Sequence, residues 1–498
     1  MKKDHNYEPT KHRRRLSLRK IPLSHWSSRQ AVIKNMCLLL VVLLTSVSQL
    51  LAQDGMPSTR SDELDPDVQQ LKILVQQLQT RVGQLEAQQK NAQTSPEAGI
   101  VSSNATVSRS STPAPTVLSQ DDRGLLDFLH DTTLNLTFDG YYGYNFNRPV
   151  GRVNLLRPYD VTSNSFSINQ TAIIVERAPD PTNGRRFGAR VDLQYGQATE
   201  TLQGSAANEL RPLAYRNLFQ AYGTYVAPLG TGLTVDFGKW ASALGPEGNY
   251  SKDQINYSRS YFFGFLPFYH MGFRAAYNVS PKMTVAYWLV NGANQTEDFN
   301  GFKSQNFEFV LKPNTSFTWT SNYYFGQESR DVLPILNPGL PTQPTQPGLP
   351  VSKVSPEPNG REHIFDNYAS WSVNKNLTLA GEFDYVIDRQ FENSAPAHVT
   401  GGAAYARYQL APKSALAARA EYLSDRGGLF SGVTQALKET TVTYEYKLAD
   451  GLSSTFELRR DFSNQPFFLT ETPGILKKEQ NTATLGLIWW WGRKTGPW

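Results

Sequence analysis

The sequence lacks any run of about 18 apolar residues, the length that a membrane-spanning helix needs. Its hydrophobic content is also low, at 39% of 498 residues. These two observations argue against a helical membrane protein. Aromatic residues, in contrast, make up 12% of the chain, with 26 Phe and 24 Tyr. Such a composition suits the aromatic girdles of a membrane β-barrel.

Cysteine is almost absent, since Cys37 is the only one and lies in the N-terminal segment. A chain processed after this segment would have no disulfide, no thiolate nucleophile and no Cys-based metal site. The common catalytic and nucleotide-binding motifs are also missing. Of the seven His, His270 is interpreted as a loop anchor rather than a ligand. We expect no enzyme and no cofactor or metal, the alternative being a barrel hydrolase whose active residues lie apart in sequence.

Positive charge is concentrated at the N-terminus. Residues 1–52 contain ten Lys or Arg and two acids, which leaves 39 basic and 42 acidic residues in the rest of the chain. A nucleic-acid partner therefore has no electrostatic support. The basic segment precedes an unbroken apolar run at 37–44, and a small-residue stretch then ends at Ala52. This order predicts a signal peptide over 1–52, with a retained inner-membrane anchor as the alternative.

Residues 62–92 have a heptad pattern that predicts a short coiled coil. The seam has the 3-4-3-4-3 spacing and consists of Val68, Leu71, Val75, Leu78, Val82 and Leu85. A single amphipathic helix lying on the barrel is the alternative. Residues 93–124 are rich in Ser, Thr, Ala and Pro and are expected to form a flexible linker.

From about residue 134, segments of roughly ten residues alternate between apolar and polar side chains. In 441–448, for example, Val442 and Tyr444 would face one side and Thr443 the other. A strand tilted through a bilayer needs about 9–11 residues and shows this period of two. Sixteen such segments are predicted, at 134–146, 166–177, 186–196, 217–227, 232–239, 270–279, 282–291, 304–312, 315–326, 362–373, 376–387, 399–410, 414–424, 438–448, 452–462 and 482–491.

The connections between these segments alternate in length. Those after even-numbered strands are short and rich in Pro, Gly and Asn, as at 179–184, 312–314 and 450–451, whereas those after odd-numbered strands are mostly longer. This asymmetry is typical of outer-membrane barrels, with short turns in the periplasm and long loops outside. We therefore predict an all-β fold, an antiparallel up-and-down barrel of about 16 strands over 125–491 with a short tail at 492–498. A soluble β-sandwich or propeller is the alternative.

Two long connections differ in composition. Residues 327–361 are Pro-rich and are predicted to form an exposed loop without strands. The connection 240–269 carries the aromatic stretch 257–269, which is too apolar to remain in water. We expect it to fold back into the barrel, so that its aromatic side chains pack on the wall and its charges face the lumen water. The candidate constriction residues are Glu247, Lys252, Asp253 and Arg259.

The last predicted strand has the polar-x-Gly-x-x-aromatic-x-aromatic spacing of the barrel-assembly signal, carried by Gly486, Trp489 and Trp491. It predicts the barrel-assembly machinery as a partner. That signal normally ends the chain, whereas a short tail follows it here. The alternative is a strand that ends in a Trp girdle.

Four segments resemble a known family. They read Asp139-Gly-Tyr-Tyr-Gly-Tyr-Asn-Phe-Asn-Arg148, Asn164-Ser-Phe-Ser167, Asn256-Tyr-Ser-Arg-Ser260 and Pro267-Phe-Tyr-His-Met-Gly-Phe-Arg274. Together they make the region 125–491 similar to the OmpL-like β-barrel porins of Gram-negative bacteria. The resemblance implies passive permeation of small hydrophilic solutes or ions across the outer membrane. A coiled coil before a porin barrel also resembles trimeric sugar-specific and anion-specific porins, which implies a homotrimer.

Charged residues on the polar faces are assigned to the lumen, because a lipid-facing Arg or Lys at the bilayer midplane costs about 2–4 kcal/mol. We expect the acids and bases to pair across the wall. The alternative is a transverse field in which loop charges oppose wall residues such as Arg190 or Arg274. A second alternative for the whole barrel is a plugged structural or adhesive protein whose external loops bind a partner. The candidate wall residues are Arg190, Asp192, Asp236, Arg274, Glu308, Lys312, Glu382, Asp384, Arg407, Arg419, Glu421, Glu445, Lys447, Glu457 and Arg459.

Overall fold

The computed structural model describes residues 130–203, 209, 212–334 and 351–493. The chain divides into two units, Met1–Ala114 and Pro115–Trp498, and every described residue belongs to the second unit. The signal peptide, the coiled-coil seam and the linker predicted above lie outside the described residues. They remain predictions.

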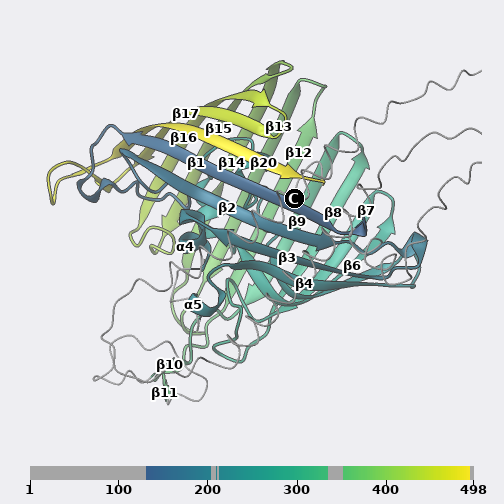
Figure 1. Cartoon of the computed structure of the whole chain (residues 1–498). Helices are drawn as coiled ribbons and strands as arrows, with labels where there is room; N and C mark the ends of the chain where they lie inside the picture. Colours follow the sequence, from purple (N-terminus) through teal and green to yellow (C-terminus); the bar gives the residue numbers. More distant parts are fainter. Residues whose placement is uncertain (1–129, 204–208, 210–211, 335–350, 494–498) are drawn as a thin grey trace, which may run out of the picture. The chain divides into compact units, whose positions relative to one another are not determined.

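Sixteen strands form a closed antiparallel barrel, each paired with its neighbour in the sequence, as predicted (Figure 1). The barrel strands are β1 (Thr133–Asn145), β2 (Ser165–Arg177), β3 (Phe187–Tyr195), β4 (Leu218–Ala227), β5 (Leu233–Ala241), β6 (Tyr269–Ser280), β7 (Met283–Val290), β8 (Ser304–Asn314), β9 (Phe317–Gly326), β12 (Glu362–Ser372), β13 (Leu377–Asp388), β14 (Ala397–Ala411), β15 (Ser414–Arg426), β16 (Gln435–Ala449), β17 (Leu452–Ser463) and β20 (Glu479–Gly492).

The barrel closes where the first strand pairs with the last. Eleven residue pairs join β1 to β20, from Asn135 opposite Gly492 to Asn145 opposite Thr482. Closure satisfies the backbone groups that an open sheet edge would expose to lipid.

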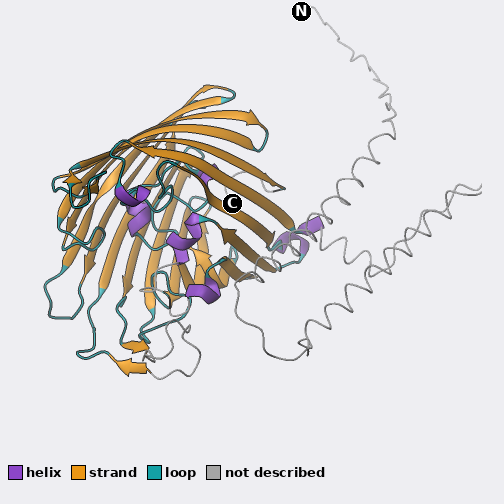
Figure 2. Ribbon diagram, turned by 60° about the vertical axis from the view of Figure 1, so that its left-hand side comes forward, coloured by secondary structure: helices purple, strands orange, loops and turns teal. Residues whose placement is uncertain are grey.

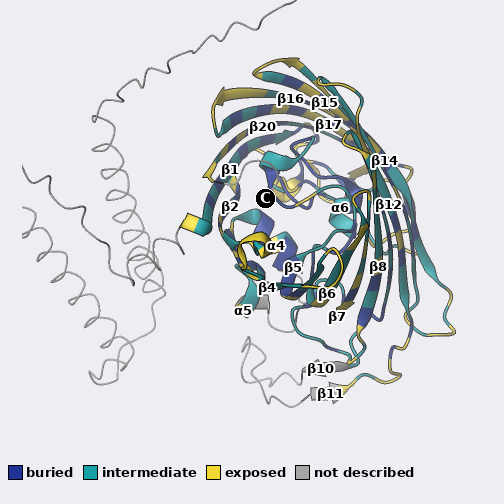
Figure 3. Cartoon of the chain, turned by 90° about the vertical axis from the view of Figure 1, so that its right-hand side faces the viewer, coloured by how far each residue is buried: buried dark blue, intermediate teal, exposed yellow. Residues whose placement is uncertain are grey.

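The two faces of each strand differ as a bilayer requires. Along β17, Glu457 and Arg459 are buried on the inner face, whereas Phe456 and Leu458 are about half exposed on the outer face, at 48% and 50%. Similar stripes are visible along β15, β16 and β20 in Figure 3. Outward aromatic rings also pair between neighbouring strands, for example those of Phe237 and Phe273, whose centroids are 4.6 Å apart.

The connections alternate in length as the sequence predicts. Only Pro281 and Lys282 separate β6 from β7, whereas residues 242–268 separate β5 from β6. The short helical elements of the described residues all lie in connections, and Figure 2 shows several of them within the ring of strands. They are η2 (Val150–Arg152), η3 (Pro181–Asn183), α4 (Gln197–Gln203), α5 (Pro212–Tyr215), η4 (Ser251–Asp253) and α6 (Tyr261–Phe265).

One prediction about the connections is wrong. Within 327–361, β10 (Val332–Pro334) and β11 (Val351–Lys353) form a two-stranded ribbon, although strands were not expected there. Pro334 occupies the final pairing position, where its missing N–H interrupts nothing further along the strand. A second ribbon joins β18 (Phe468–Leu469) to β19 (Leu476–Lys477) in the connection that precedes β20. Among the described residues, no helix has the length and apolar character needed to cross a membrane.

Candidate functional site: the inner loop and the lumen wall

The connection between β5 and β6, residues 242–268, is called the inner loop here. It contacts β1 and β3 from inside the barrel. The hydroxyls of Tyr257 and Ser251 donate to Asp139 on β1, at 2.8 and 2.6 Å, and the Tyr250 hydroxyl donates to Asp192 on β3. The prediction that this segment folds back into the barrel is therefore confirmed.

The start of the inner loop contacts β9 and β12. Asn322 Nδ2 and the Tyr368 hydroxyl donate to the Ala243 carbonyl at 3.2 and 3.1 Å, and the Gly245 amide donates to Asp366 Oδ2 at 3.1 Å. Because β9 and β12 are remote from β1 in the barrel order, the inner loop is attached to well-separated parts of the wall.

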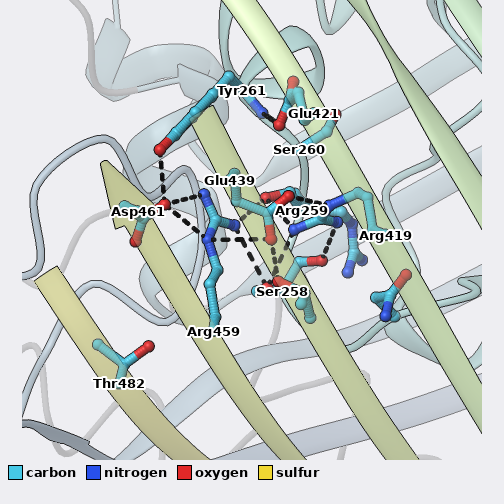
Figure 4. A network of polar contacts seen from close by, with 12 residues as sticks. Ser258, Arg259, Ser260, Tyr261, Arg419, Glu421, Glu439, Arg459, Asp461 and Thr482 are labelled. Atoms are coloured by element: carbon cyan, nitrogen blue, oxygen red, sulfur yellow. Dashed lines mark hydrogen bonds and ion pairs between the residues drawn. The ribbon is translucent and has the colours of Figure 1, made fainter. Parts of the chain in front are cut away.

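Two buried arginines bind the middle of the inner loop on the side of β15 and β17 (Figure 4). Arg419 donates to the carbonyls of Ser258 and Arg259 at 2.7 and 3.1 Å, and Arg459 donates to the same Arg259 carbonyl at 2.5 Å. Arg419 also pairs with Glu439 at 2.9 Å. A guanidinium suits this position because its planar array of donors serves several acceptors at once.

Two wall carboxylates each bind two successive backbone amides of the inner loop. Glu457 accepts from Tyr257 N and Ser258 N at 2.8 and 3.0 Å, and Glu421 accepts from Tyr261 N and Phe262 N at 2.9 and 3.0 Å. The latter two amides open α6, where the first N–H groups have no partner within the helix. The wall thus supplies partners for the polar backbone of a loop removed from solvent.

Gly486 on β20 makes room for the inner loop. A Cβ atom at this position would lie 2.6 Å from Tyr257 Cε2 and 2.6 Å from Thr455 Oγ1. Since Tyr257 also reaches Asp139, its ring is clamped between β20 and β1. Any larger residue at 486 would displace the loop.

The connection between β1 and β2, residues 146–164, covers the inner loop. Tyr159 donates to Asn249 Oδ1 at 2.6 Å, and its ring lies 5.4 Å from that of Phe263. Arg157 bridges Asp160 at 2.6 Å and Asp461 of β17 at 3.2 Å. Burial raises the pKa of Asp160 to about 6, although Arg157 acts in the opposite direction.

A family model described as "Putative beta-barrel porin-2, OmpL-like" matches residues 131–489. The match begins just before β1 and ends within β20, so it includes the inner loop and every barrel strand. The chain belongs to this family. It is a transmembrane barrel of the bacterial outer membrane, and the resemblance inferred from the four sequence segments is confirmed.

Solved structures with a similar barrel include other outer-membrane proteins. OmpT of Vibrio cholerae is 10% identical, with 72% of this chain and 98% of that chain covered, at a TM-score of 0.44. An anion-selective porin from Comamonas acidovorans is 8% identical, with 72% and 99% covered, at 0.45. The channel DcaP of Acinetobacter baumannii is 9% identical, with 72% and 97% covered, at 0.46. No curated protein matches the sequence.

The predicted constriction residues of this porin all lie in the inner loop, but their charges are already bound. Glu247 pairs with Arg419 at 2.9 Å, and Lys252 pairs with Asp253 at 2.6 Å. The expectation that Arg259 faces water is wrong. Its side chain is 0% exposed and donates to the carbonyls of Tyr257, Gly248 and Asn249. A loop that turns away from water needs internal donors for its carbonyls, and Arg259 supplies them.

The predicted wall residues lie on the inner faces of their strands. Several form ion pairs, namely Arg190 with Asp192 at 2.8 Å, Arg274 with Asp236 at 2.8 Å and Arg407 with Glu445 at 2.7 Å. Since Arg190 and Arg274 are bound to neighbouring acids, they are not free to oppose the loop charges in a transverse field.

Four further wall acids that bind the inner loop or its two arginines were missing from the sequence prediction. Asp139 and Asp366 bind the inner loop, and Glu439 and Asp461 bind the two arginines. The period-two alternation of their predicted strands would have placed all four on the polar face. Arg157 had no such signal, because it lies outside any strand.

The remaining predicted site residues are found at the two ends of the barrel. Trp489 and Trp491 face outward and are exposed, as a girdle requires, and their role in assembly stays a prediction. His270 is buried between Ser242 Oγ and the Gly292 carbonyl, each 3.1 Å from a ring nitrogen. It joins two long connections, which agrees with the role of loop anchor.

Proposed function

We propose that this porin allows passive diffusion of small hydrophilic solutes or ions across the outer membrane, through a passage that the inner loop narrows. The observation that carries the proposal is the attachment of the inner loop to separated parts of one closed wall, at Asp139, Asp366 and Glu457. A segment held in this way reduces the cross-section available to a solute.

The proposal involves no chemistry and no cofactor. The buried charges described above are used to hold the inner loop, and such pairing is a structural role.

We also propose a homotrimer, which follows from the predicted seam around Leu78, and assembly through the barrel-assembly machinery. The lipid-facing aromatic girdles support a membrane location. The wall residues named above include more acids than bases, which supports small cations among the permeant solutes.

A plugged structural or adhesive barrel is the second candidate. It is favoured by the packing of the 146–164 connection on the inner loop, where Arg157, Tyr159 and Phe263 fill space inside the strands. External connections would then bind the partner.

Single-channel recording in planar bilayers separates the two functions. Removal of 248–259 with a short Gly-Ser replacement should raise conductance severalfold, because the narrowest part of the passage is then lost. A homotrimer should insert with current steps in groups of three. A matched deletion of 337–348, in the Pro-rich connection, is the control and should leave conductance unchanged.

The two variants must both show the heat-modifiable migration of a folded barrel before they are compared. Equal conductance in the wild-type protein and the 248–259 deletion would place the inner loop outside the permeation path. Absence of conductance in the wild-type protein and in both deletion variants would favour the plugged barrel.

A further inference from the structure

Three carboxylates gather on the lumen wall beside the start of the inner loop. Asp366 on β12 and Asp384 on β13 are directly opposite each other in the strand register, and Glu382 lies two residues from Asp384 on the same face. One oxygen from each of the three lies within 4.8 Å of the others. Asp366 and Asp384 are 0% exposed and Glu382 is 7% exposed.

Little in the surroundings compensates these three carboxylates. Among the described residues, no Lys or Arg forms an ion pair with any of them. Asp366 Oδ2 accepts from Asn322 Nδ2 at 2.8 Å and from the Gly245 amide at 3.1 Å, and Glu382 Oε2 accepts from the Tyr405 hydroxyl at 3.2 Å. Asp366 Oδ1 and both oxygens of Asp384 are buried without a hydrogen-bond partner.

This arrangement is unfavourable as it stands. Like charges opposite each other on paired strands destabilise a sheet, and a buried carboxylate without a partner costs more than an exposed one. Either the group holds protons or a cation completes it. The unpartnered oxygens of Asp384 point to the second, because neither is used elsewhere and one of them lies within 4.8 Å of an oxygen of each of the other two carboxylates.

We propose that Asp366, Glu382 and Asp384 bind a hard divalent cation, with Ca²⁺ preferred. Carboxylate oxygens are the ligands of Ca²⁺ and Mg²⁺, whereas sites for zinc or copper use His or Cys, which this cluster lacks. Asp384 offers two free oxygens and Asp366 one, and Glu382 Oε1 lies toward the inner loop. Ca²⁺ tolerates an irregular arrangement of oxygen ligands and completes its coordination shell with water, whereas Mg²⁺ demands near-octahedral coordination.

The cation would fasten the start of the inner loop to the wall. Gly245 has a φ of +79°, and a Cβ atom there would lie 2.9 Å from Glu382 Oε1. The glycine therefore allows the loop to approach the carboxylates closely while its amide binds Asp366. This inference goes beyond the proposed permeation function and holds whether or not the barrel conducts.

The test uses the full-length protein in detergent, stripped with EDTA and then titrated with CaCl₂ alone. Calorimetry should show saturable Ca²⁺ binding, and the temperature of the heat-modifiable transition should rise with the same midpoint. Terbium should replace Ca²⁺ and show luminescence sensitised by tyrosine, since Tyr405 lies beside Glu382. The variant Asp384→Asn should weaken Ca²⁺ binding roughly tenfold or more, because affinity follows the number of charged ligands.

The control variant is Glu445→Gln, a wall carboxylate that already has an arginine partner at 2.7 Å. It should bind Ca²⁺ as the wild-type protein does. If Asp384→Asn does not fold, Glu382→Gln takes its place in the comparison.

Two results would overturn the proposal. In one, the wild-type protein shows no saturable response to millimolar Ca²⁺; greater stability of Asp384→Asn in EDTA would then mean that the carboxylates share protons. In the other, wild-type and Asp384→Asn respond equally, which would place the binding elsewhere on the chain or in bound lipid.

Discussion

Among the acids that face each other across neighbouring strands of the lumen wall, two pairs are compensated very differently. Glu421 on β15 is opposite Glu439 on β16, and Asp366 on β12 is opposite Asp384 on β13. Arg419 pairs with Glu439, and two amides of the inner loop bind Glu421. At the other pair, Asp384 has no partner among the described residues. Protein groups therefore compensate the repulsion between Glu421 and Glu439, whereas the repulsion between Asp366 and Asp384 is not compensated by the described residues.

The difference shows what the inner loop does for the wall. On the side of β15–β17, its carbonyls bind arginines and its amides bind carboxylates, so wall and loop neutralise one another. On the side of β12–β13, it offers a single amide, from Gly245. We therefore expect the first side to control the stability of the folded lumen and the second to respond to added cations.

The largest effect is expected for Arg419→Met. It leaves Glu247 without its arginine partner, Glu439 with only the more distant Arg459 at 3.7 Å, and the Ser258 carbonyl without its donor. Breaking such a buried pair costs about 3–5 kcal/mol. Urea unfolding followed by heat-modifiable migration measures the loss.

Arg407→Met is the matched control for that experiment. Arg407 also pairs with a wall acid, but its side chain is 28% exposed. Its loss should cost about 0–1 kcal/mol, as for an exposed pair. Equal losses in the two variants would show that the loop network contributes nothing special.

An effect of intermediate size is expected for the pH dependence of stability at Asp160, the partner of Arg157. The pKa of Asp160 is raised by burial to about 6, above its usual value of 3.8. The native state therefore binds a proton that the unfolded chain has lost, so this contribution is complete below about pH 4 and disappears as the pH rises through 6. Between about pH 4 and pH 6, the free energy of unfolding should therefore fall by at most about 3 kcal/mol.

The variant Asp160→Asn should remove this dependence, because the amide does not titrate. The transition temperature of the wild-type protein should fall between pH 4 and pH 7 more than that of the variant. Parallel curves for the two proteins would exclude Asp160 as the source. Arg157 stays bound to Asp461 in both and limits any secondary change.

The smallest effect is expected for Glu457→Gln. An NH₂ group replaces one of the two acceptor oxygens, so the remaining oxygen must serve Tyr257 N, Ser258 N and the Thr443 hydroxyl, and the amide of Ser258 loses its shorter contact of 3.0 Å and keeps the one of 3.3 Å. The expected cost is about 1–2 kcal/mol in urea unfolding. Glu445→Gln, in the more exposed pair with Arg407, should change stability less. The reverse order would mean that the backbone contacts of Glu457 are not important.

Much of the fold could be predicted because its causes are local. A period of two over about ten residues identifies a membrane strand, and the alternation also selects the side of each charge, as for Glu457 and Arg459. The ribbon of β10 and β11 was missed because proline content is a weak guide where only three residues pair. The bonding of Arg259 was missed because its acceptors are backbone carbonyls, which no side-chain pattern reveals.

The sequence by itself determined the number of strands, their inner and outer faces and the entry of an aromatic loop into the barrel, because each follows from the contrast between lipid and water along a short segment. Only the tertiary structure decided which charges meet. Glu457 binds the amide of Tyr257 across 200 positions, and Asp384 is left without a partner because of the path that the inner loop takes. Such pairings depend on where a chain segment crosses the lumen, and no local pattern records that path.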